Sequence, residues 1–343
     1  MPGASPDVTP EDPALTAAAA AGVHRIAVPT PFLVGRVNTY LVEDDPLTLV
    51  DGGPNSGTSL TELEQGLAAR GHGIDDLRRI VVTHQHIDHI GLVGILARRS
   101  GAEVCALDAL APWLEDYRAS TEADDRFADA VMERHGIPHD LRLGLRAVSA
   151  AFRGYGGSAH VDTPLAPGAQ LAFRDRTWTV HHRPGHSPSD TIFEDTERRM
   201  LFGGDHLIGH ISSNPLVSRP LAGGDPDARP EALRDYIASM LLTGAMALDV
   251  VLPGHGAPVT DVAGLVDERV RLHEKRAAKI VKLLVDGPLT AFEIATRMWG
   301  NVAVTQAYLT LSEVLGHVDL LLARGEALEH RDGDGVTRFE LPA

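Results

Sequence analysis

The sequence predicts an α/β protein in which strands and helices alternate through most of the chain. Short apolar or β-branched runs, separated by turn residues, recur from about residue 23 to residue 256, with helical patterns between them. This alternation is typical of a layered α/β domain. From residue 267 onward the apolar spacing becomes helical and ends in two short strand-like runs. We therefore expect one large domain, at 23–265, followed by a small second domain at 266–343.

Composition excludes several classes of protein. Of the 343 residues, 43% are hydrophobic and 23% are charged, which is an ordinary globular balance rather than that of a disordered chain or a fibre. No run approaches the roughly 18 to 20 apolar residues that a membrane helix needs. The formal net charge of −16 disfavours general binding to phosphate backbones. The single cysteine, Cys105, excludes an intramolecular disulfide, and its apolar neighbours predict a buried strand position.

The amino-terminal half predicts a regular series of elements. Residues 1–22 are rich in Pro, Ala, Asp and Glu, and we expect a flexible tail without the positive residues of a secretory signal. A cytoplasmic protein with no membrane contact is therefore expected. A helix is expected over 59–70 with Ser59 as its N-cap, and Gly101 should end a later helix as its C-cap. The expected strands are 25–28, 38–43, 47–51, 79–83, 103–107, 169–173, 177–182, 191–195, 200–204 and 249–254.

Residues 109–159 interrupt this alternation with a helical insertion. Two interpretations are open: a lid or substrate-pocket insertion, and a purely structural helical hairpin. Its apolar side chains could cover a substrate, although some must pack the insertion itself. They are Trp113, Leu114, Tyr117, Phe127, Val131, Met132, Phe152 and Tyr155.

The carboxyl-terminal domain has the element order of a winged helix. Three helical segments precede strand-like runs at 327–331 and 336–341, with a DGDG turn between them. Basic and acidic residues are nearly balanced over this region, whereas a DNA-binding wing usually carries a basic stripe. We expect a structural or dimerisation role and no specific DNA binding; whether the chain forms a homodimer is left open.

The residues that carry chemistry begin directly after the apolar strand at 79–83. His84, His86, Asp88 and His89 place three imidazoles and a carboxylate within six residues. On a tight strand-to-helix turn the first two histidines could face one metal ion, and Asp88 and His89 a second. Imidazole and carboxylate ligands suit Zn²⁺ and similar divalent metals without any thiolate.

Three later segments share one arrangement, in which a ligand-type residue follows an apolar strand beside glycine. These are His186 in RPGHS, Asp205 after MLFGG and His255 in VLPGHG. Glycine permits the close backbone approach that such strand ends require. Each segment alone is weak evidence, but together they predict a metal centre at one edge of the sheets.

Taken together, these motifs resemble the metallo-β-lactamase fold superfamily over about residues 23–260. The signature H-x-H-x-D-H matches His84, His86, Asp88 and His89. The resemblance implies an αββα sandwich with two metal ions, most simply zinc, with iron or manganese as alternatives. In the implied ligand sets, the first ion takes His84, His86 and His186. The second takes Asp88, His89 and His255.

The resemblance also implies roles for neighbouring residues. Asp205 would bridge the two ions, and Asp51 would support the metal loop by hydrogen bonds. Asp88 would be the catalytic residue that orients a metal-bridged hydroxide and shuttles its proton. The remaining histidines of these segments match no ligand position and are expected to be structural or supporting: His181, His182, His206 and His210.

Several branches of that superfamily fit the sequence poorly. True metallo-β-lactamases usually have cysteine where this chain has Asp205, and flavodiiron enzymes usually have glutamate in place of His86. The stretch from Asp205 to His255 is too short for the domain of β-CASP nucleases. The remaining group is similar to glyoxalase II, acyl-thioesterases, lactonases and lactamase-beta-like hydrolases with a winged-helix tail. We therefore expect hydrolysis of an ester-like bond, foremost a thioester of a small-molecule or carrier-bound acyl group. A single-strand ribonuclease or other phosphodiesterase, a lactonase and a mono-iron sulfur dioxygenase are the alternatives.

Overall fold

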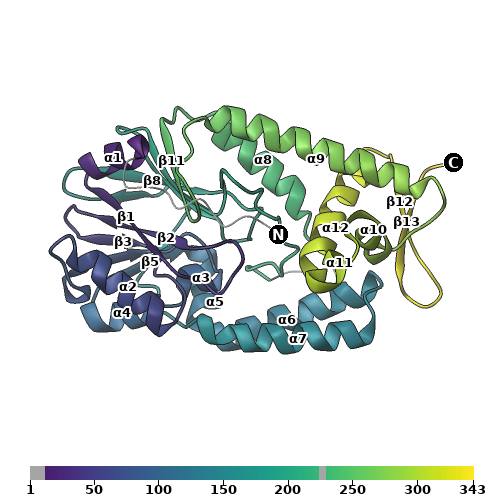
Figure 1. Ribbon diagram of the computed structural model, residues 1–343, viewed down its shortest axis with the longest axis horizontal. Coiled ribbons are helices and arrows are strands. Elements are labelled where there is room, and N and C mark those ends of the chain that lie inside the picture. The colour runs from purple at the N-terminus through teal and green to yellow at the C-terminus, as the bar shows by residue number, and fades with distance from the viewer. Residues whose placement is uncertain (1–11, 224–228) are drawn as a thin grey trace.

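Two β-sheets packed face to face, with helices on both outer faces, form the larger part of the molecule (Figure 1). The structure is a computed structural model that describes residues 12–223 and 229–343. The αββα arrangement agrees with the predicted fold class. The first sheet has the order β1 (Val23–Val28), β2 (Val37–Val42), β3 (Thr48–Val50), β4 (Arg79–Val81), β5 (Glu103–Leu107) and β6 (Thr163–Leu165). The second has the order β11 (Val250–Pro253), β10 (Met200–Gly204), β9 (Thr191–Asp195), β8 (Thr177–His182) and β7 (Gln170–Ala172).

Three layers of apolar side chains hold the sandwich together. Between the sheets, Tyr40 and Val81 of the first pack with Trp178 and Phe202 of the second, and Cys105 is buried among them as predicted. The outer face of the first sheet is covered by α2 (Gly57–Ala68) and α4 (Val93–Ser100), with the short segments η1 (Ile74–Asp76) and α3 (Ile87–Ile90) beside them. The outer face of the second is covered by α8 (Ala232–Gly244) and the start of α9 (Val262–Leu284).

Two expectations about the amino-terminal half were wrong. Helix α2 begins at Gly57, and its N-cap is Ser56, whose hydroxyl oxygen accepts a hydrogen bond from the Ser59 amide at 3.1 Å. Ser59 instead lies inside the helix, where its hydroxyl donates to the Pro29 carbonyl. Residues 13–20 are not a loose tail but form α1 (Pro13–Ala20), because Asp12 caps the helix and Ala18 is buried against the sandwich. The rest of the expected tail lies outside the described residues.

The insertion is a helical hairpin that reaches from the sandwich to the carboxyl-terminal domain (Figure 1). Its main helices, α6 (Tyr117–Arg134) and α7 (His139–Phe152), follow η2 (Asp108–Leu110) and α5 (Ala111–Glu115) and precede η3 (Arg153–Tyr155). Most of its apolar side chains pack in the cores of the two domains that it joins. Trp113, Leu114 and Tyr117 lie in the core of the first sheet. Phe127, Val131 and Met132 join the carboxyl-terminal core.

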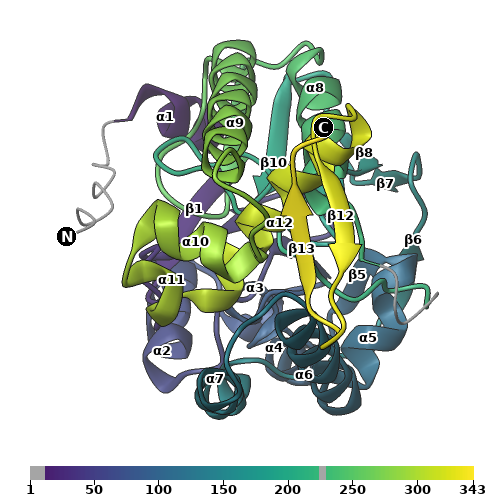
Figure 2. The same cartoon turned by 90° about the vertical axis from the view of Figure 1, so that its right-hand side faces the viewer.

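The carboxyl-terminal domain consists of helices and one antiparallel hairpin (Figure 2). Its elements after α9 are α10 (Ala291–Trp299), α11 (Val302–Thr305), α12 (Ala307–Ala323), β12 (Leu328–Arg331) and β13 (Thr337–Glu340). Helix α9 runs through the expected boundary at 265/266 without a break. Val266 packs on the second sheet, whereas Ile280 packs in the carboxyl-terminal core. The order of helices and hairpin is as expected from the sequence; the winged-helix identity stays a prediction.

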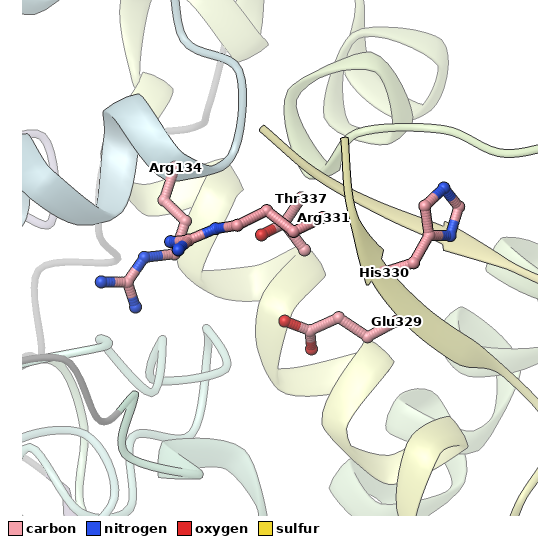
Figure 3. A pocket seen from close by; sticks show the side chains of 5 residues that line it. All are labelled: Arg134, Glu329, His330, Arg331 and Thr337. Carbon is pink, nitrogen blue, oxygen red and sulfur yellow. The ribbon is translucent and has the colours of Figure 1, made fainter. Parts of the chain in front are cut away.

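An open pocket of about 550 Å³ lies between this hairpin and the end of α6. Figure 3 shows Arg134 reaching it from α6, and the other lining residues on β12 and β13. Those residues are Glu329, His330, Arg331 and Thr337. None of them is a predicted metal ligand. Among the described helices, none is long and apolar enough to cross a membrane.

Candidate metal centre

The structure brings all seven predicted ligand residues together at one edge of the sandwich. Each follows the carboxyl end of a strand: the H-x-H-x-D-H segment follows β4, His186 follows β8, Asp205 follows β10 and His255 follows β11. They form three overlapping groups whose ligand atoms lie within 4.8 Å of one another. The first group is His84, His86 and His186, and the second is Asp88, His89 and His255. The third, His84, His89 and Asp205, shares one residue with each of the other two.

The first group is a cluster of imidazole nitrogens. His86 Nδ1 lies 3.1 Å from His84 Nε2 and 2.9 Å from His186 Nε2. Nitrogens bound tetrahedrally to one zinc ion at about 2.0–2.1 Å are separated by about 3.3 Å. The three nitrogens are therefore spaced as ligands of one ion would be.

The second group adds carboxylate oxygens to imidazole nitrogens. His255 Nε2 lies 3.3 Å from Asp88 Oδ2 and 3.5 Å from Asp205 Oδ2. That same Asp205 oxygen lies 3.6 Å from His186 Nε2, while Asp205 Oδ1 lies 3.4 Å from His89 Nε2. Asp205 thus faces ligand atoms of both groups, which is the position that a bridging ligand requires.

Buried atoms without partners show that this donor set fits a cation. His89 Nε2, His255 Nε2 and Asp205 Oδ1 are buried and make no hydrogen bond. Leaving such groups unpaired costs about 1–3 kcal/mol each, so their convergence on one point needs a compensating ligand. Neutral imidazole and carboxylate are the ligands that zinc and similar ions prefer.

A second set of contacts orients the ligands. His255 Nδ1 lies 2.8 Å from the Arg36 carbonyl oxygen, and His186 Nδ1 lies 3.1 Å from that of Asn214. Because a carbonyl only accepts, each Nδ1 carries a hydrogen, so that Nε2 is the nitrogen of each ring that can bind a cation once it is deprotonated. Support of this kind is usual for metal-bound histidine.

Asp51 performs the supporting role that the sequence resemblance implies. Its carboxylate accepts hydrogen bonds from the Thr83 amide and hydroxyl, both at 2.8 Å. It also lies 2.8 Å from His89 Nδ1. The Thr83 hydroxyl oxygen in turn lies 3.0 Å from His84 Nδ1 and accepts from it. One carboxylate therefore orients a ligand of each group.

Charge in the centre is balanced by protons when no cation is present. Burial alone would lower the pKa of His255, but the Asp205 and Asp88 carboxylates raise it to about 10. His89 behaves likewise, because Asp205 and Asp51 outweigh its burial and raise its pKa. By contrast, burial and the neighbouring His186 lower the pKa of His86 to about 3. Asp88 and Asp205 are held ionised by the facing imidazoles, although burial opposes this by raising the pKa of each carboxyl.

The histidines that match no ligand position lie around the centre rather than in it. His181 Nε2 lies 2.8 Å from Glu194, and His206 Nε2 lies 2.9 Å from the Thr243 hydroxyl. His182 Nε2 donates to the Pro188 carbonyl at 2.9 Å. His210 is exposed and its ring lies against Gly256, next to the ligand His255.

The sequence reasoning missed several supporting residues. Ser189 accepts a hydrogen bond from the Gln85 amide at 3.0 Å, and Asp190 accepts from the Ser187 amide and hydroxyl, which fixes the turn after His186. The polar run HSPSD was a visible signal for that turn. Arg269 of α9 donates to the carbonyls of Ile208, Gly209 and Ile211 in the loop after Asp205. No local signal indicated this contact, which joins segments about 60 residues apart.

With the geometry in place, comparison with known proteins decides the family. The model of the metallo-beta-lactamase superfamily matches residues 33–255, more than half of the chain. The chain belongs to this superfamily. Membership implies a divalent metal centre, in agreement with the clusters described above.

Relatives and solved structures are similar to this chain over most of its length. The chain is 32% identical over 315 residues to a probable metallo-hydrolase, YqjP, of Bacillus subtilis, covering 92% of this chain and 96% of that protein. It is 25% identical to an atrochrysone carboxyl ACP thioesterase of Aspergillus terreus, over 60% of each chain. A beta-lactamase domain protein from Burkholderia ambifaria superposes with a TM-score of 0.74 at 26% identity, covering 93% of this chain and 92% of that one. A metallo-beta-lactamase family protein from Thermus thermophilus has a TM-score of 0.78 at 24% identity, covering 94% and 99%, and shows the shared fold.

Gly254 should be essential for metal binding in this superfamily member. A Cβ atom there would lie 2.3 Å from Asp205 Oδ1 and 2.6 Å from His89 Cε1, so both ligands would have to move. We expect Gly254→Ala to lose most of its bound metal, measured by elemental analysis after dialysis. Gly144→Ala, in α7 with no atom within 4 Å of the new Cβ, is the matched control and should keep it. A fully loaded Gly254→Ala protein would contradict the arrangement.

Metal binding should release protons and strengthen as the pH rises. Since the pKa of His255 is raised to about 10 and that of His89 is also raised, both rings are protonated near neutral pH without metal. A histidine binds metal only as neutral imidazole, so each of these rings must release its proton first. At pH values below these pKa values, the dissociation constant of the metal should therefore fall about tenfold per released proton for each unit by which the pH rises. Calorimetric titrations in buffers of different ionisation enthalpy would measure the protons released. A pH-independent affinity between pH 6 and 9 would rule out this protonation state.

Proposed function

We propose that the chain is a metal-dependent hydrolase of ester-like bonds, and that its substrate is an acyl thioester. The observation that carries the hydrolase proposal is the complete donor set, with a carboxylate facing both groups of imidazoles. His84, His86 and His186 would hold one ion, Asp88, His89 and His255 a second, and Asp205 both. Ions bound there supply Lewis acidity and lower the pKa of water toward neutrality.

Asp88 is the side chain best suited to handle the proton of the reaction. Burial would raise the pKa of Asp88, but His255, whose Nε2 lies 3.3 Å from its Oδ2, lowers it, so the carboxylate is ionised and can accept a proton. Its position at the start of α3, between His86 and His89, keeps it at the same edge as the ligands. We assign Asp88 the role of orienting the attacking water and receiving its proton.

Aromatic side chains on segments next to the predicted metal ligands favour an acyl group over a polyanion. The Tyr155 carbonyl accepts a hydrogen bond from the Asn55 amide at 2.6 Å and lies against Gly91, two residues after His89. The Phe152 ring lies 6.0 Å from that of Tyr155 and stacks on Phe32 at 5.3 Å. Leu33 follows Phe32 in the chain and is 81% exposed. An apolar surface of this kind suits an acyl chain.

Nearby cations are already engaged by the protein itself. Arg36, whose carbonyl holds His255, forms an ion pair with Glu62. Arg269 donates to three backbone carbonyls, and Arg183 to that of His182. A nuclease needs several free cations to hold phosphates across its cleft. Similarity to a protein named as an acyl-carrier thioesterase agrees with the thioester proposal.

Replacing the proposed bridging residue should disturb the whole centre. We expect Asp205→Ala to lose both ions and to lower the rate of hydrolysis at least 100-fold. Loss of a residue that only supports a metal ligand typically costs about 10- to 100-fold, and loss of a bridging ligand should cost more. His84→Gln should chiefly weaken the first ion. Elemental analysis and activity on the same samples are the measurements. An Asp205→Ala protein with full metal content and full activity would refute the assignment.

Acyl thioesters should be cleaved faster than phosphodiesters. The test is a panel of short- and long-chain thioesters, lactones, single-stranded RNA and bis-p-nitrophenyl phosphate, run on protein of defined metal content. Efficient cleavage of RNA with all thioesters and lactones untouched would replace this proposal by a phosphodiesterase. Preference for a lactone would favour a lactonase. A requirement for one iron ion and oxygen would favour a sulfur dioxygenase.

Leu33 provides a sharper version of the same test. If its exposed side chain contacts the acyl group, Leu33→Ser should lower kcat/KM for long-chain thioesters about fivefold, the effect of about 1 kcal/mol of lost apolar contact. Short-chain thioesters should be nearly unaffected, and so should the metal content. Leu241→Ser, at an exposed position on α8, is the matched control and should change neither. Equal effects of both variants would exclude an acyl-binding role for Leu33.

A further inference from the structure

A second group of metal-ligand side chains lies between α9 and α12. His273 belongs to α9, while Glu313 and His317 are one turn apart on α12 and therefore share a face. The three residues are almost fully buried, with exposed fractions of 1%, 8% and 1% respectively. One ligand atom of each lies within 4.8 Å of those of the other two. None of these residues takes part in the centre described above.

The two imidazoles are spaced like ligands of one ion. His273 Nδ1 lies 3.2 Å from His317 Nε2. The corresponding distances between ligand nitrogens in the principal centre are 3.1 and 2.9 Å. The pair therefore has the same nitrogen spacing as the centre whose family implies a metal.

His317 is also oriented as a metal ligand. Its Nδ1 lies 2.6 Å from the Glu313 carbonyl oxygen, so this nitrogen carries the hydrogen. The lone pair of Nε2 then faces His273. His186 and His255 of the principal centre are held in the same way, by the carbonyls of Asn214 and Arg36.

Hydrogen bonding alone leaves the pair incomplete. Either tautomer of His273 leaves its buried Nε2 without a hydrogen-bond partner. With the proton on Nε2, the lone pair of His273 Nδ1 faces that of His317 Nε2 across 3.2 Å, an arrangement that a shared cation would stabilise. A carboxylate oxygen of Glu313 lies within 4.8 Å of a ring nitrogen of each histidine. Oε1 accepts from Arg276 at 2.6 Å, which leaves the remaining lone pairs of the carboxylate for a cation. Two imidazoles and a carboxylate, all buried, form a donor set suited to zinc.

We propose that His273, Glu313 and His317 form a second metal site, which binds one Zn²⁺ or a similar divalent transition-metal ion. It would join α9 to α12 inside the carboxyl-terminal half of the chain. Arg269, one turn before His273 on α9, holds the loop that follows Asp205. An ion here would therefore stiffen the scaffold on which the principal centre rests. The proposal does not depend on which bond the enzyme hydrolyses.

The experiment compares the metal content of the full chain with that of variants. Each protein is stripped with a chelator, reloaded with zinc or cobalt, dialysed and analysed for metal per chain. We expect the unchanged chain to hold one ion more than the His273→Gln/His317→Gln variant, whatever the occupancy of the principal centre. Cobalt loading should show an absorption component that the variant lacks. His135→Gln, which removes another buried imidazole packed on Phe339, is the matched control and should lose no ion.

A third variant covers the case in which the double variant does not fold. Glu313→Gln keeps the shape of the side chain and an oxygen for Arg276, but it removes the charge. We expect it to bind the additional ion at least about tenfold more weakly, as for other losses at metal sites. Equal metal content and equal cobalt spectra in the unchanged chain and in Glu313→Gln would overturn the proposal. So would equal values in a folded double variant, since the pair would then be a neutral hydrogen-bonded contact.

Discussion

The arrangement of the metal centre depends on one buried carboxylate, that of Asp51. It follows β3, accepts two hydrogen bonds from Thr83 after the neighbouring β4, and contacts the ligand His89. Through the Thr83 hydroxyl it also orients His84. Asp51 has a positive φ of 59°, which is uncommon for a residue other than glycine. From this backbone the carboxylate reaches Thr83 and His89, and these contacts align the ends of two parallel strands with one predicted ligand from each group.

The other side of the centre depends on the carboxyl-terminal half of the chain. The loop after Asp205 supplies the carbonyl of Asn214 to His186, and Ser213 donates to the Asp205 carbonyl at 2.5 Å. That loop is held by Arg269 of α9 and by the Asn214 side chain, whose Nδ2 donates a hydrogen bond to the Leu309 carbonyl of α12. The carboxyl-terminal domain is therefore part of the support of the metal centre. The similarity to YqjP, which covers 92% of this chain, also extends into this domain.

Features that depend on neighbouring residues in the chain could be predicted from the sequence, whereas contacts between distant segments could not. Strands β5, β8, β9 and β10 have the predicted bounds, since alternation and flanking turns are local properties. The seven predicted ligand residues lie together in the structure, and the sequence pointed to them because each is a ligand-type side chain beside a strand end. Ser56 was missed as a cap because Ser59 offers an equally good local signal, and only burial against Pro29 distinguishes them. Arg269 could not have been found, because its function is a contact with backbone atoms far away in the chain.

The same reasoning explains why the substrate is harder to predict than the metal. The chemistry of a metal ion limits which side chains can bind it, so metal-binding residues can be recognised from the sequence. The insertion, by contrast, packs on both the first sheet and the carboxyl-terminal core, and its sequence does not show which side chains face which. Val131 and Met132 resemble Phe152 in apolar character, yet the former pack against α12 while the latter stacks on Phe32 beside the centre. Because α6 and α7 are fixed by the carboxyl-terminal core, the side chains left facing the metal edge depend on how the two parts pack. If the proposed acyl-binding role is right, substrate preference depends on that packing, and a change in the carboxyl-terminal core should alter it without touching a proposed metal ligand.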